Sequence, residues 1–375
     1  MNTASSELEI RRVITLDGCG AQERLISTRI NGHEPREMFA KFPPASDQIA
    51  AQLVFGGCRF EKEARARMGA TEWPLLWVQG DGSSGNQIVG VQTFELEGCS
   101  LRRVTAGDRV IGTCWSDSDA DYCLLAGVLP TDPTAHRSVQ TRSCFQQIEA
   151  ALQQADMDFS HIVRTWFYLD KLLAWYDEFN TVRTAFFQSR GVFNRLLPAS
   201  TGIGAGNPAG AALTAGVLAV RPRHNRVQIQ TVTSPRQGPA TAYCSSFSRA
   251  VELAFPTRRQ LIISGTASIT PGGKTAFAGN PRQQMHLTLE VVEALLKARG
   301  MDWSHATRAV GYFQDIRALD TFDACCRERH IPPLPMAPAH AAICRSDLLF
   351  ELEIDAVVSA TMDPQNSVAK GTTVR

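Results

Sequence analysis

The chain of 375 residues lacks both a long apolar run and a strong excess of charge of either sign. No stretch reaches the roughly 18–20 apolar residues that a membrane-spanning helix requires. Lysine and arginine number 38 against 37 aspartates and glutamates, so nothing favours DNA or RNA as a partner. The first twelve residues, MNTASSELEIRR, lack the apolar core of a signal peptide. We therefore expect a cytoplasmic protein with no membrane and no nucleic-acid partner.

Motifs for metals and nucleotides are also missing. The ten cysteines are scattered without CxxC spacing, and the eight histidines are equally dispersed, so there is no zinc pattern. Neither a GxGxxG fingerprint nor a GxxxxGK[ST] phosphate loop occurs. The composition is that of a globular protein with a large core, since 44% of the residues are apolar and 20% are charged. A small-molecule ligand is compatible with this composition.

An internal repeat organises the second half of the chain. The segment 157–168 (MDFSHIVRTWFY) recurs as 301–312 (MDWSHATRAVGY), with six identities at a constant offset of 144 residues. The histidines in these two segments, His161 and His305, are expected to serve in turns or caps. A repeat of this length is typical of duplicated structural units.

The residues around each copy predict the same order of elements. Apolar residues at three- and four-residue spacing predict a helix before each copy, a strand follows, and then a second helix and further strands. The expected helices are 144–155, 175–189, 285–296 and 319–329, and the expected strands are 166–169, 211–220, 310–313, 341–344 and 350–358. This pattern predicts an α+β fold of tandem mixed β-sheets, each with helices on one face.

Four regions follow from this reading. Residues 1–100 match the repeat poorly and are either a decayed third copy or an unrelated cap. Residues 101–225 form the first unit and 240–362 the second, with a linker at 222–242. The polar tail 363–375 is expected to be flexible.

The second unit resembles YjgF/RidA proteins. Its segments 245–250 (SSFSRA) and 262–266 (IISGT) resemble their GPYSQA and FxSGQ segments, and 350–356 (FELEIDA) resembles their IEIEA strand. Those proteins are single units that assemble as trimers and bind a carboxylate with an arginine. His340 occupies that position here, and Ser200 occupies it in the first unit, which argues against imine hydrolysis.

A long chain with two such units is similar to the chorismatase family. The similarity lies in 164–169 (RTWFYL), 247–253 (FSRAVEL) and 344–356 (CRSDLLFELEIDA). It implies an enzyme that converts chorismate to pyruvate and 3-hydroxybenzoate without metal or organic cofactor. Some members also release 4-hydroxybenzoate. It further implies that Glu351 is the catalytic acid and that Cys344, seven residues earlier, marks 3-hydroxybenzoate producers; Glu353 is the alternative acid.

Strand geometry supports this assignment. A hairpin over 341–358 that turns at Asp347 and Leu348 would place Cys344 opposite Glu351. Alternation along the strand would direct Glu351, Glu353 and Asp355 to one face. If water is excluded, their mutual repulsion raises the pKa of at least one, as a general acid near neutral pH requires.

Chorismate carries two carboxylates, which guanidinium groups bind well. The candidate substrate-binding residues are Arg164, Tyr168, Arg221, Phe247, Gly265, Thr266 and Arg345, with Gly265 and Thr266 offering backbone donors between the units. The competing functions are a RidA-type imine or enamine hydrolase and a non-catalytic ligand-binding protein. Fused units can replace the contacts between RidA subunits, so we expect a monomer or a small homo-oligomer.

Overall fold

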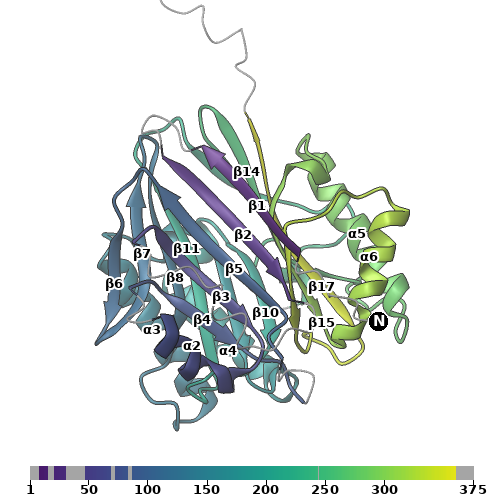
Figure 1. The fold of residues 1–375 in the computed structure, drawn as a ribbon, viewed down its shortest axis with the longest axis horizontal. Coiled ribbons are helices and arrows are strands. Elements are labelled where there is room, and N and C mark those ends of the chain that lie inside the picture. The colour runs from purple at the N-terminus through teal and green to yellow at the C-terminus, as the bar shows by residue number, and fades with distance from the viewer. Residues whose placement is uncertain are drawn as a thin grey trace, which may run out of the picture.

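The computed structural model describes residues 8–15, 21–30, 47–68, 72–82, 87–243 and 245–359. These residues form three β-sheets that meet in the middle of the molecule, and helices lie on the outside (Figure 1). The α+β architecture of tandem mixed sheets with helices on one face is confirmed. The predicted tail at 363–375 lies outside the described residues.

The middle unit (102–222) and the C-terminal unit (228–359) share one topology. The middle unit contains β6 (Arg102–Ala106), β7 (Arg109–Ser116), β8 (Ala120–Val128), α3 (Arg137–Gln153), β9 (Ile162–Leu169), α4 (Tyr176–Ser189), β10 (Ala199–Gly204) and β11 (Leu213–Pro222). The C-terminal unit contains β12 (Gln228–Val232), β13 (Ala250–Ala254), β14 (Arg258–Ala267), α5 (Pro281–Ala298), β15 (Ala306–Phe313), α6 (Leu319–Glu328), β16 (Met336–His340) and β17 (Phe350–Ser359). Their strand orders, β6-β7-β8-β11-β9-β10 and β12-β13-β14-β17-β15-β16, are equivalent.

Two local expectations are wrong. The segment 222–242 is not only a linker, because it contains β12, which pairs with β13 at the edge of the third sheet. The expected hairpin over 341–358 does not form either. The strand β16 ends at His340 and pairs in parallel with β15, while β17 lies between β14 and β15.

The N-terminal unit (8–97) repeats the same plan. It contains β1 (Leu8–Thr15), β2 (Gln22–Arg29), β3 (Ile49–Phe55), α2 (Glu61–Met68), β4 (Leu75–Val78) and β5 (Gly90–Glu97), in the order β1-β2-β5-β3-β4. The helix α2 joins the parallel strands β3 and β4, just as α4 and α6 join the parallel pairs β9–β10 and β15–β16. This region is therefore a diverged third copy rather than an unrelated cap.

The three units close into a ring. The strand β10 of the middle unit packs against β14, β16 of the C-terminal unit against β2, and β4 of the N-terminal unit against β8. Each unit thus presents its last parallel strand to the next unit in the same way. One chain reproduces the cyclic arrangement that a trimer of single units would have.

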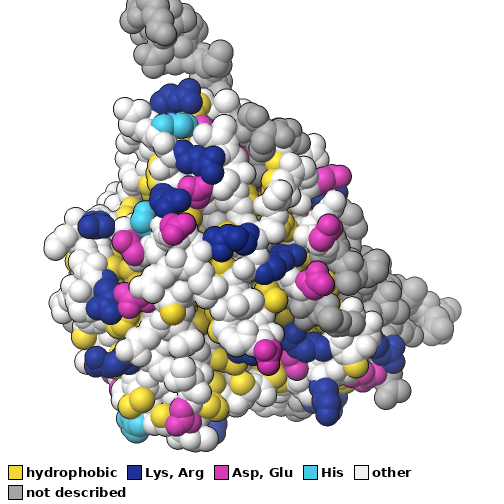
Figure 2. Space-filling model, turned by 90° about the vertical axis from the view of Figure 1, so that its left-hand side faces the viewer, with side chains coloured by type: hydrophobic (Ala, Val, Ile, Leu, Met, Phe, Trp, Pro, Cys, Tyr) yellow, Lys and Arg dark blue, Asp and Glu magenta, His cyan; other side chains and the backbone are white. Residues whose placement is uncertain are grey.

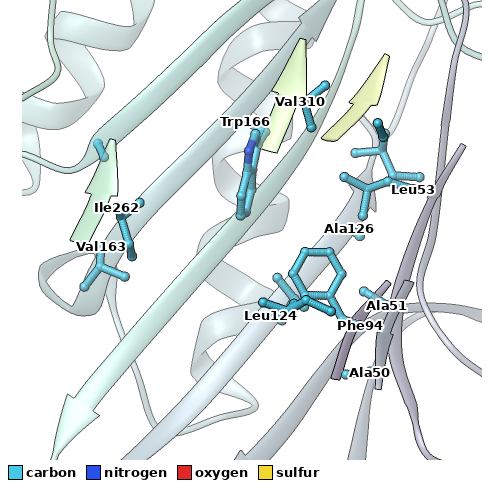
Figure 3. Close-up of a cluster of buried hydrophobic side chains, with 14 of the residues drawn as sticks. Ala50, Ala51, Leu53, Phe94, Leu124, Ala126, Val163, Trp166, Ile262 and Val310 are labelled. Carbon is cyan, nitrogen blue, oxygen red and sulfur yellow. The ribbon is translucent and has the colours of Figure 1, made fainter. Parts of the chain in front are cut away.

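Apolar side chains from all three sheets fill the centre of this ring. Figure 3 shows Leu53 and Phe94 of the first sheet close to Leu124 and Trp166 of the second and Val310 of the third. Separate apolar clusters lie between each sheet and its helices. The helices therefore cover the outer faces, and the inner faces of the sheets bury one another.

Local sequence explains where the elements begin. The Asn280 side chain caps α5 by accepting from the backbone of Gln283, and Pro281 occupies its first position. The two repeat segments at 157 and 301 each form a short 3-10 turn with a capping box, in which His161 and His305 accept from the backbone of Asp158 and Asp302. The expected capping role of both histidines is confirmed.

Candidate active site

The inner face of β17 carries three buried acids, as strand alternation predicts. Glu351, Glu353 and Asp355 are 5%, 0% and 8% exposed. Their neighbours Leu352 and Ile354 point into the outer core beneath α5. The three carboxyl groups therefore lie where the C-terminal unit meets the rest of the ring.

Glu353 is held as an ionised group by two arginines. Arg164 of β9 donates to its Oε2 at 2.6 Å, Arg308 of β15 forms an ion pair with its Oε1, and Trp166 Nε1 donates to Oε1 at 3.0 Å. Burial alone would raise the pKa of Glu353, but Arg164 and Arg308 outweigh it and lower the pKa to about 2. A carboxylate so firmly ionised cannot donate a proton near neutral pH.

Glu351, in contrast to Glu353, is held in its protonated form. Burial, reinforced by the charge of Glu353, raises the pKa of Glu351 from 4.5 to about 8. A Cβ atom added at Gly265 would lie 1.9 Å from Glu351 Oε1, so only glycine at this position leaves room for the carboxyl group. Glu351 is the acid on this strand that carries a proton at pH 7 and faces a cavity.

That cavity lies at the junction of the middle and C-terminal units and has a volume of about 220 Å³. The helix α4, the strands β10, β14 and β17, and the segments before β13 and β17 all contribute to it. Its lining residues are Tyr176, Asp177, Asn180, Arg183, Ser200, Gly202, Ser245, Phe247, Arg249, Gly265, Ala267, Ile269, Cys344, Arg345 and Glu351.

Cys344 and Glu351 both line this cavity, although not through the expected hairpin. Cys344 lies in the segment between β16 and β17, and it is partly buried. Burial and the neighbouring Glu351 raise the pKa of the Cys344 thiol to about 12. At neutral pH it is therefore a protonated thiol beside the acid, not a thiolate nucleophile.

Three guanidinium groups surround the acid. Arg249 donates through Nε to the Gly238 carbonyl at 3.0 Å and is 6% exposed, and Arg183 is 1% exposed. Arg345 donates to the Gly273 carbonyl at 2.8 Å. With Glu351 protonated, these three cations and the exposed Asp177 leave the lining with a net charge of 3 − 1 = +2. Such a cavity matches a small dianion.

Comparison with known proteins identifies the scaffold. Residues 119–232 and 239–360 both match the family model described as endoribonuclease L-PSP. The chain belongs to the endoribonuclease L-PSP family. This is the YjgF/RidA family that the sequence resembles, and the two matches fall on the middle and C-terminal units.

Two curated proteins that are similar in sequence to this chain are named as enzymes. The chain is 29% identical over 265 residues to a 3-hydroxybenzoate synthase of Streptomyces hygroscopicus, covering 63% of this chain and 74% of that protein. It is 28% identical over 221 residues to a chorismatase of Streptomyces rapamycinicus, covering 52% of this chain and 64% of that protein.

A solved chorismatase crystal structure has the same fold. It superposes with a TM-score of 0.64 at 18% sequence identity, and the match covers 90% of this chain and 98% of that one. The shared fold thus extends over the N-terminal unit as well as the two units that match the family model.

The L-PSP scaffold places five of the ten predicted site residues around the cavity. These are Phe247, Gly265, Cys344, Arg345 and Glu351. The Gly265 backbone N–H donates to Thr201 Oγ1 at 3.1 Å rather than into the cavity.

The other five do not line the cavity. Arg164 and Glu353 are paired with each other, and Tyr168 contacts the equivalent Tyr312 with its hydroxyl at 3.1 Å. Thr266 is buried and donates to the Ser264 carbonyl. Arg221 pairs with Asp121 at 2.9 Å and lines a different cavity. Arg164, Glu353 and Tyr168 make contacts between the middle and C-terminal units.

Sequence reasoning missed the contribution of α4. Tyr176, Asn180 and Arg183 follow one another at four- and three-residue spacing, so they share one face of the helix. Arg183 Nη2 donates to Asn180 Oδ1 at 2.6 Å, which fixes the guanidinium at the cavity wall. This spacing was visible in the sequence, whereas its orientation towards the neighbouring unit was not. Arg249 was equally overlooked, although it lies within FSRAVEL.

Charge on the surface is mixed. Figure 2 shows basic and acidic side chains interspersed over one face of the molecule, with no continuous basic area in that view. Within the described ranges, no helix has both the length and the apolar character needed to cross a membrane. Nor do the described His, Cys, Asp and Glu residues form a group suited to a metal ion.

Proposed function

We propose that this protein is a chorismatase that converts chorismate to pyruvate and 3-hydroxybenzoate. The observation that carries the proposal is Glu351, a buried carboxylic acid with a pKa of about 8 beside Cys344 in a cavity lined by three arginines. The names of the two curated relatives support the same reaction.

The first step is a proton transfer. The carboxylic acid of Glu351 donates its proton to the methylene carbon of the enolpyruvyl ether, and the electron pair of the carbon–carbon double bond forms the new C–H bond. The ether carbon becomes an oxocarbenium-like centre, which makes the bond between the ether oxygen and the ring cleavable. Arg183, Arg249 and Arg345 orient the two carboxylates of the substrate.

The second step determines the product. If water adds to the activated group, pyruvate leaves with a dihydroxy-cyclohexadiene acid. If the ether bond breaks at the ring, the neighbouring hydroxyl oxygen loses its proton and bonds to the carbon that the ether oxygen leaves, with assistance from Cys344, which gives an epoxide. Opening of this epoxide at the carbon that first carried the hydroxyl, with loss of the proton from the other carbon, gives 3-hydroxybenzoate. The atoms of chorismate equal those of pyruvate plus hydroxybenzoate, so this second course consumes no water overall. Cys344 beside the acid favours it.

The test is to incubate the purified protein with chorismate and to measure pyruvate enzymatically and the ring acids by chromatography. We expect pyruvate in an amount equal to the sum of the ring acids, with 3-hydroxybenzoate as the main ring product and 4-hydroxybenzoate as a minor one. We also expect Glu351→Gln, which keeps the size of the side chain but has no acidic proton, to lose turnover. Absence of pyruvate above background would exclude the proposal, and full activity of Glu351→Gln would reassign the acid.

A further inference from the structure

Two cysteines of the middle unit face each other on neighbouring strands, outside the proposed active site. Cys114 of β7 is the direct partner of Cys123 of β8 in the antiparallel register. Directly opposed residues of antiparallel strands have Cα atoms about 4.5 or 5.5 Å apart, and both spacings lie within the range of about 4.4–6.8 Å that a disulfide spans. Both side chains belong to the same outer core, and both are free thiols. The sheet therefore holds the two thiols where a bond between them can form.

The surroundings of Cys114 favour its thiolate. Arg102 of β6 is the partner of Cys114 on the other side, so Arg102, Cys114 and Cys123 form one row on one face of the sheet. A hydrogen bond with the Cys123 thiol lowers the pKa of Cys114 despite burial, and the charge of Arg102 acts in the same direction. The same hydrogen bond raises the pKa of Cys123. Cys114 is therefore the more nucleophilic thiol of the pair.

Cys114 differs in this respect from other thiols of the chain. Burial raises the pKa of Cys144, Cys326 and Cys344 to about 12. Those three thiols are protonated at neutral pH, and a protonated thiol is a poor nucleophile. An oxidant that selects thiolates should therefore react with Cys114 before it reacts with them.

A cavity gives small molecules access to Cys114. Its volume is about 500 Å³, and its lining includes Cys99, Arg102, Cys114 and Arg221. Cys114 is 7% exposed and belongs to this lining, whereas Cys123 is 0% exposed and does not. A molecule as small as hydrogen peroxide can reach the first thiol from the cavity. The second thiol lies behind it and is reached only by Cys114 itself.

The fold itself does not require cysteines at these positions. The bulges of β8 and β14 align the middle and C-terminal units, which places Leu261 where Cys123 stands and its partner Glu252 where Cys114 stands. Glu252 forms an ion pair with Arg299, which lowers the pKa of Glu252 although burial opposes this. The equivalent position thus holds an anion in the C-terminal unit. This row of the sheet can therefore accommodate the negative charge of a Cys114 thiolate.

We propose that Cys114 and Cys123 form a redox modification site, which hydrogen peroxide converts from two thiols to a disulfide. The Cys114 thiolate attacks one peroxide oxygen, the O–O bond breaks, and the leaving hydroxide takes up the proton that Cys114 had released. Cys114 is then a sulfenic acid. The Cys123 sulfur attacks the Cys114 sulfur, the S–O bond breaks, and water leaves with the proton of the Cys123 thiol. Two thiols are oxidised and one peroxide is reduced to two waters. The site lies outside the cavity of Glu351 and does not rest on the proposed function.

The test treats the reduced full chain with limiting hydrogen peroxide at neutral pH, blocks the remaining thiols and maps the peptides by mass spectrometry without reductant. An aspartate-specific protease separates the two cysteines, because Asp117, Asp119 and Asp121 lie between them. We expect a linked pair of peptides containing Cys114 and Cys123, the loss of two of the ten thiols, and recovery of both with dithiothreitol.

Variants separate the roles of the two thiols. In Cys123→Ala, Cys114 should remain a sulfenic acid, which dimedone labels, whereas in Cys114→Ala the Cys123 thiol should stay reduced. Cys99→Ala is the matched control, since it removes a thiol of the same cavity that is not in the pair, and it should still form the disulfide. Thermal unfolding midpoints show whether each variant is folded, and the map of the wild type needs no variant.

Three results would overturn the proposal. A link between Cys114 and Cys99 would give the cavity thiol a different partner. Consumption of other thiols while Cys114 and Cys123 stay reduced would show that the cavity gives no access to the pair. The same link formed at the same rate in urea would show that closeness in the sequence, not the register of β7 and β8, brings the two thiols together.

Discussion

At the scale of single residues, the two glutamates of β17 show how position alone separates the roles of identical side chains. Glu353 faces two arginines and stays ionised, with a pKa of about 2, whereas Glu351 faces an enclosed cavity, with a pKa of about 8. The charge on Glu353 contributes to the raised pKa of Glu351. The sequence predicted that one of the acids would have a raised pKa, but the choice between them required the positions of the arginines.

The first prediction concerns the pH dependence of turnover. Because Glu351 must be protonated to act as the acid, kcat for pyruvate release should be level below its pKa of about 8. Above that pH it should fall by about tenfold per pH unit. The measurement is a pH–rate profile with saturating chorismate. A rate that remains level well above pH 8 would assign the proton to another group.

The second prediction concerns stability. The folded protein keeps the proton of Glu351 up to a pKa of about 8, whereas the unfolded chain loses it near 4.5. The folded state therefore binds more protons between these values, and the contribution of this group to the free energy of unfolding falls as the pH rises from 4.5 to about 8. The free energy of unfolding, measured by urea titration at several pH values, should fall more steeply with pH in the wild type than in Glu351→Gln over this window. Equal slopes would show that Glu351 is not desolvated.

The third prediction concerns the product. Cys344→Ala removes the thiol beside the acid but leaves Glu351 in place, so pyruvate should still form while the ring product shifts towards the non-aromatic diene acid. Chromatography of the ring acids checks this, and Cys326→Ala, a cysteine on α6 outside the cavity, is the matched control. An unchanged yield of 3-hydroxybenzoate from Cys344→Ala would contradict a role of the thiol in product choice.

At the scale of elements, β9, β15 and β17 show what sequence reasoning could and could not reach. The repeat predicted strands at 166–169 and 310–313, which are the second halves of β9 and β15, and alternation placed the acids of β17 on one face. Arg164 was expected to meet the substrate because arginines bind carboxylates. It meets Glu353 instead, since the partner comes from another unit and the sequence contains no record of which strands face each other.

The fourth prediction compares two arginines that each pair with an acid. Arg164→Met leaves the fully buried Glu353 with one guanidinium fewer and should destabilise the protein by about 3–5 kcal/mol. Arg221→Met breaks a similar pair with Asp121, but the Arg221 side chain is 37% exposed, so we expect a loss of at most about 1 kcal/mol. Chemical denaturation of both variants measures the difference. Equal losses would indicate that the Arg164 pair does not hold the units together.

At the scale of the whole molecule, the two units that are recognisable in the sequence do not close the ring by themselves. The N-terminal unit, a diverged third copy, packs against both of them and closes it. The N-terminal unit has lost the sequence signature of the repeat, so only the strand order and the parallel β3–β4 pair reveal it. Its Gln92 donates to the Ala309 carbonyl of the C-terminal unit at 2.7 Å, at the centre of the ring. A position on the ring constrains shape and packing but not the identity of each residue, which is why the sequence could diverge while the fold persisted.

The fifth prediction separates the scaffold from the chemistry. Every residue that lines the proposed active site lies between 176 and 351, so the N-terminal unit contributes none of them. It does cover apolar inner faces, since β4 packs on β8 and β2 packs on β16. A chain that begins at residue 101 should therefore keep all cavity residues and yet expose the central core, which favours aggregation or self-association. Size-exclusion chromatography with light scattering and thermal unfolding check this expectation. A soluble monomeric fragment with the melting temperature of the full chain would show that the middle and C-terminal units form a complete core by themselves, and that closure of the ring does not stabilise the site.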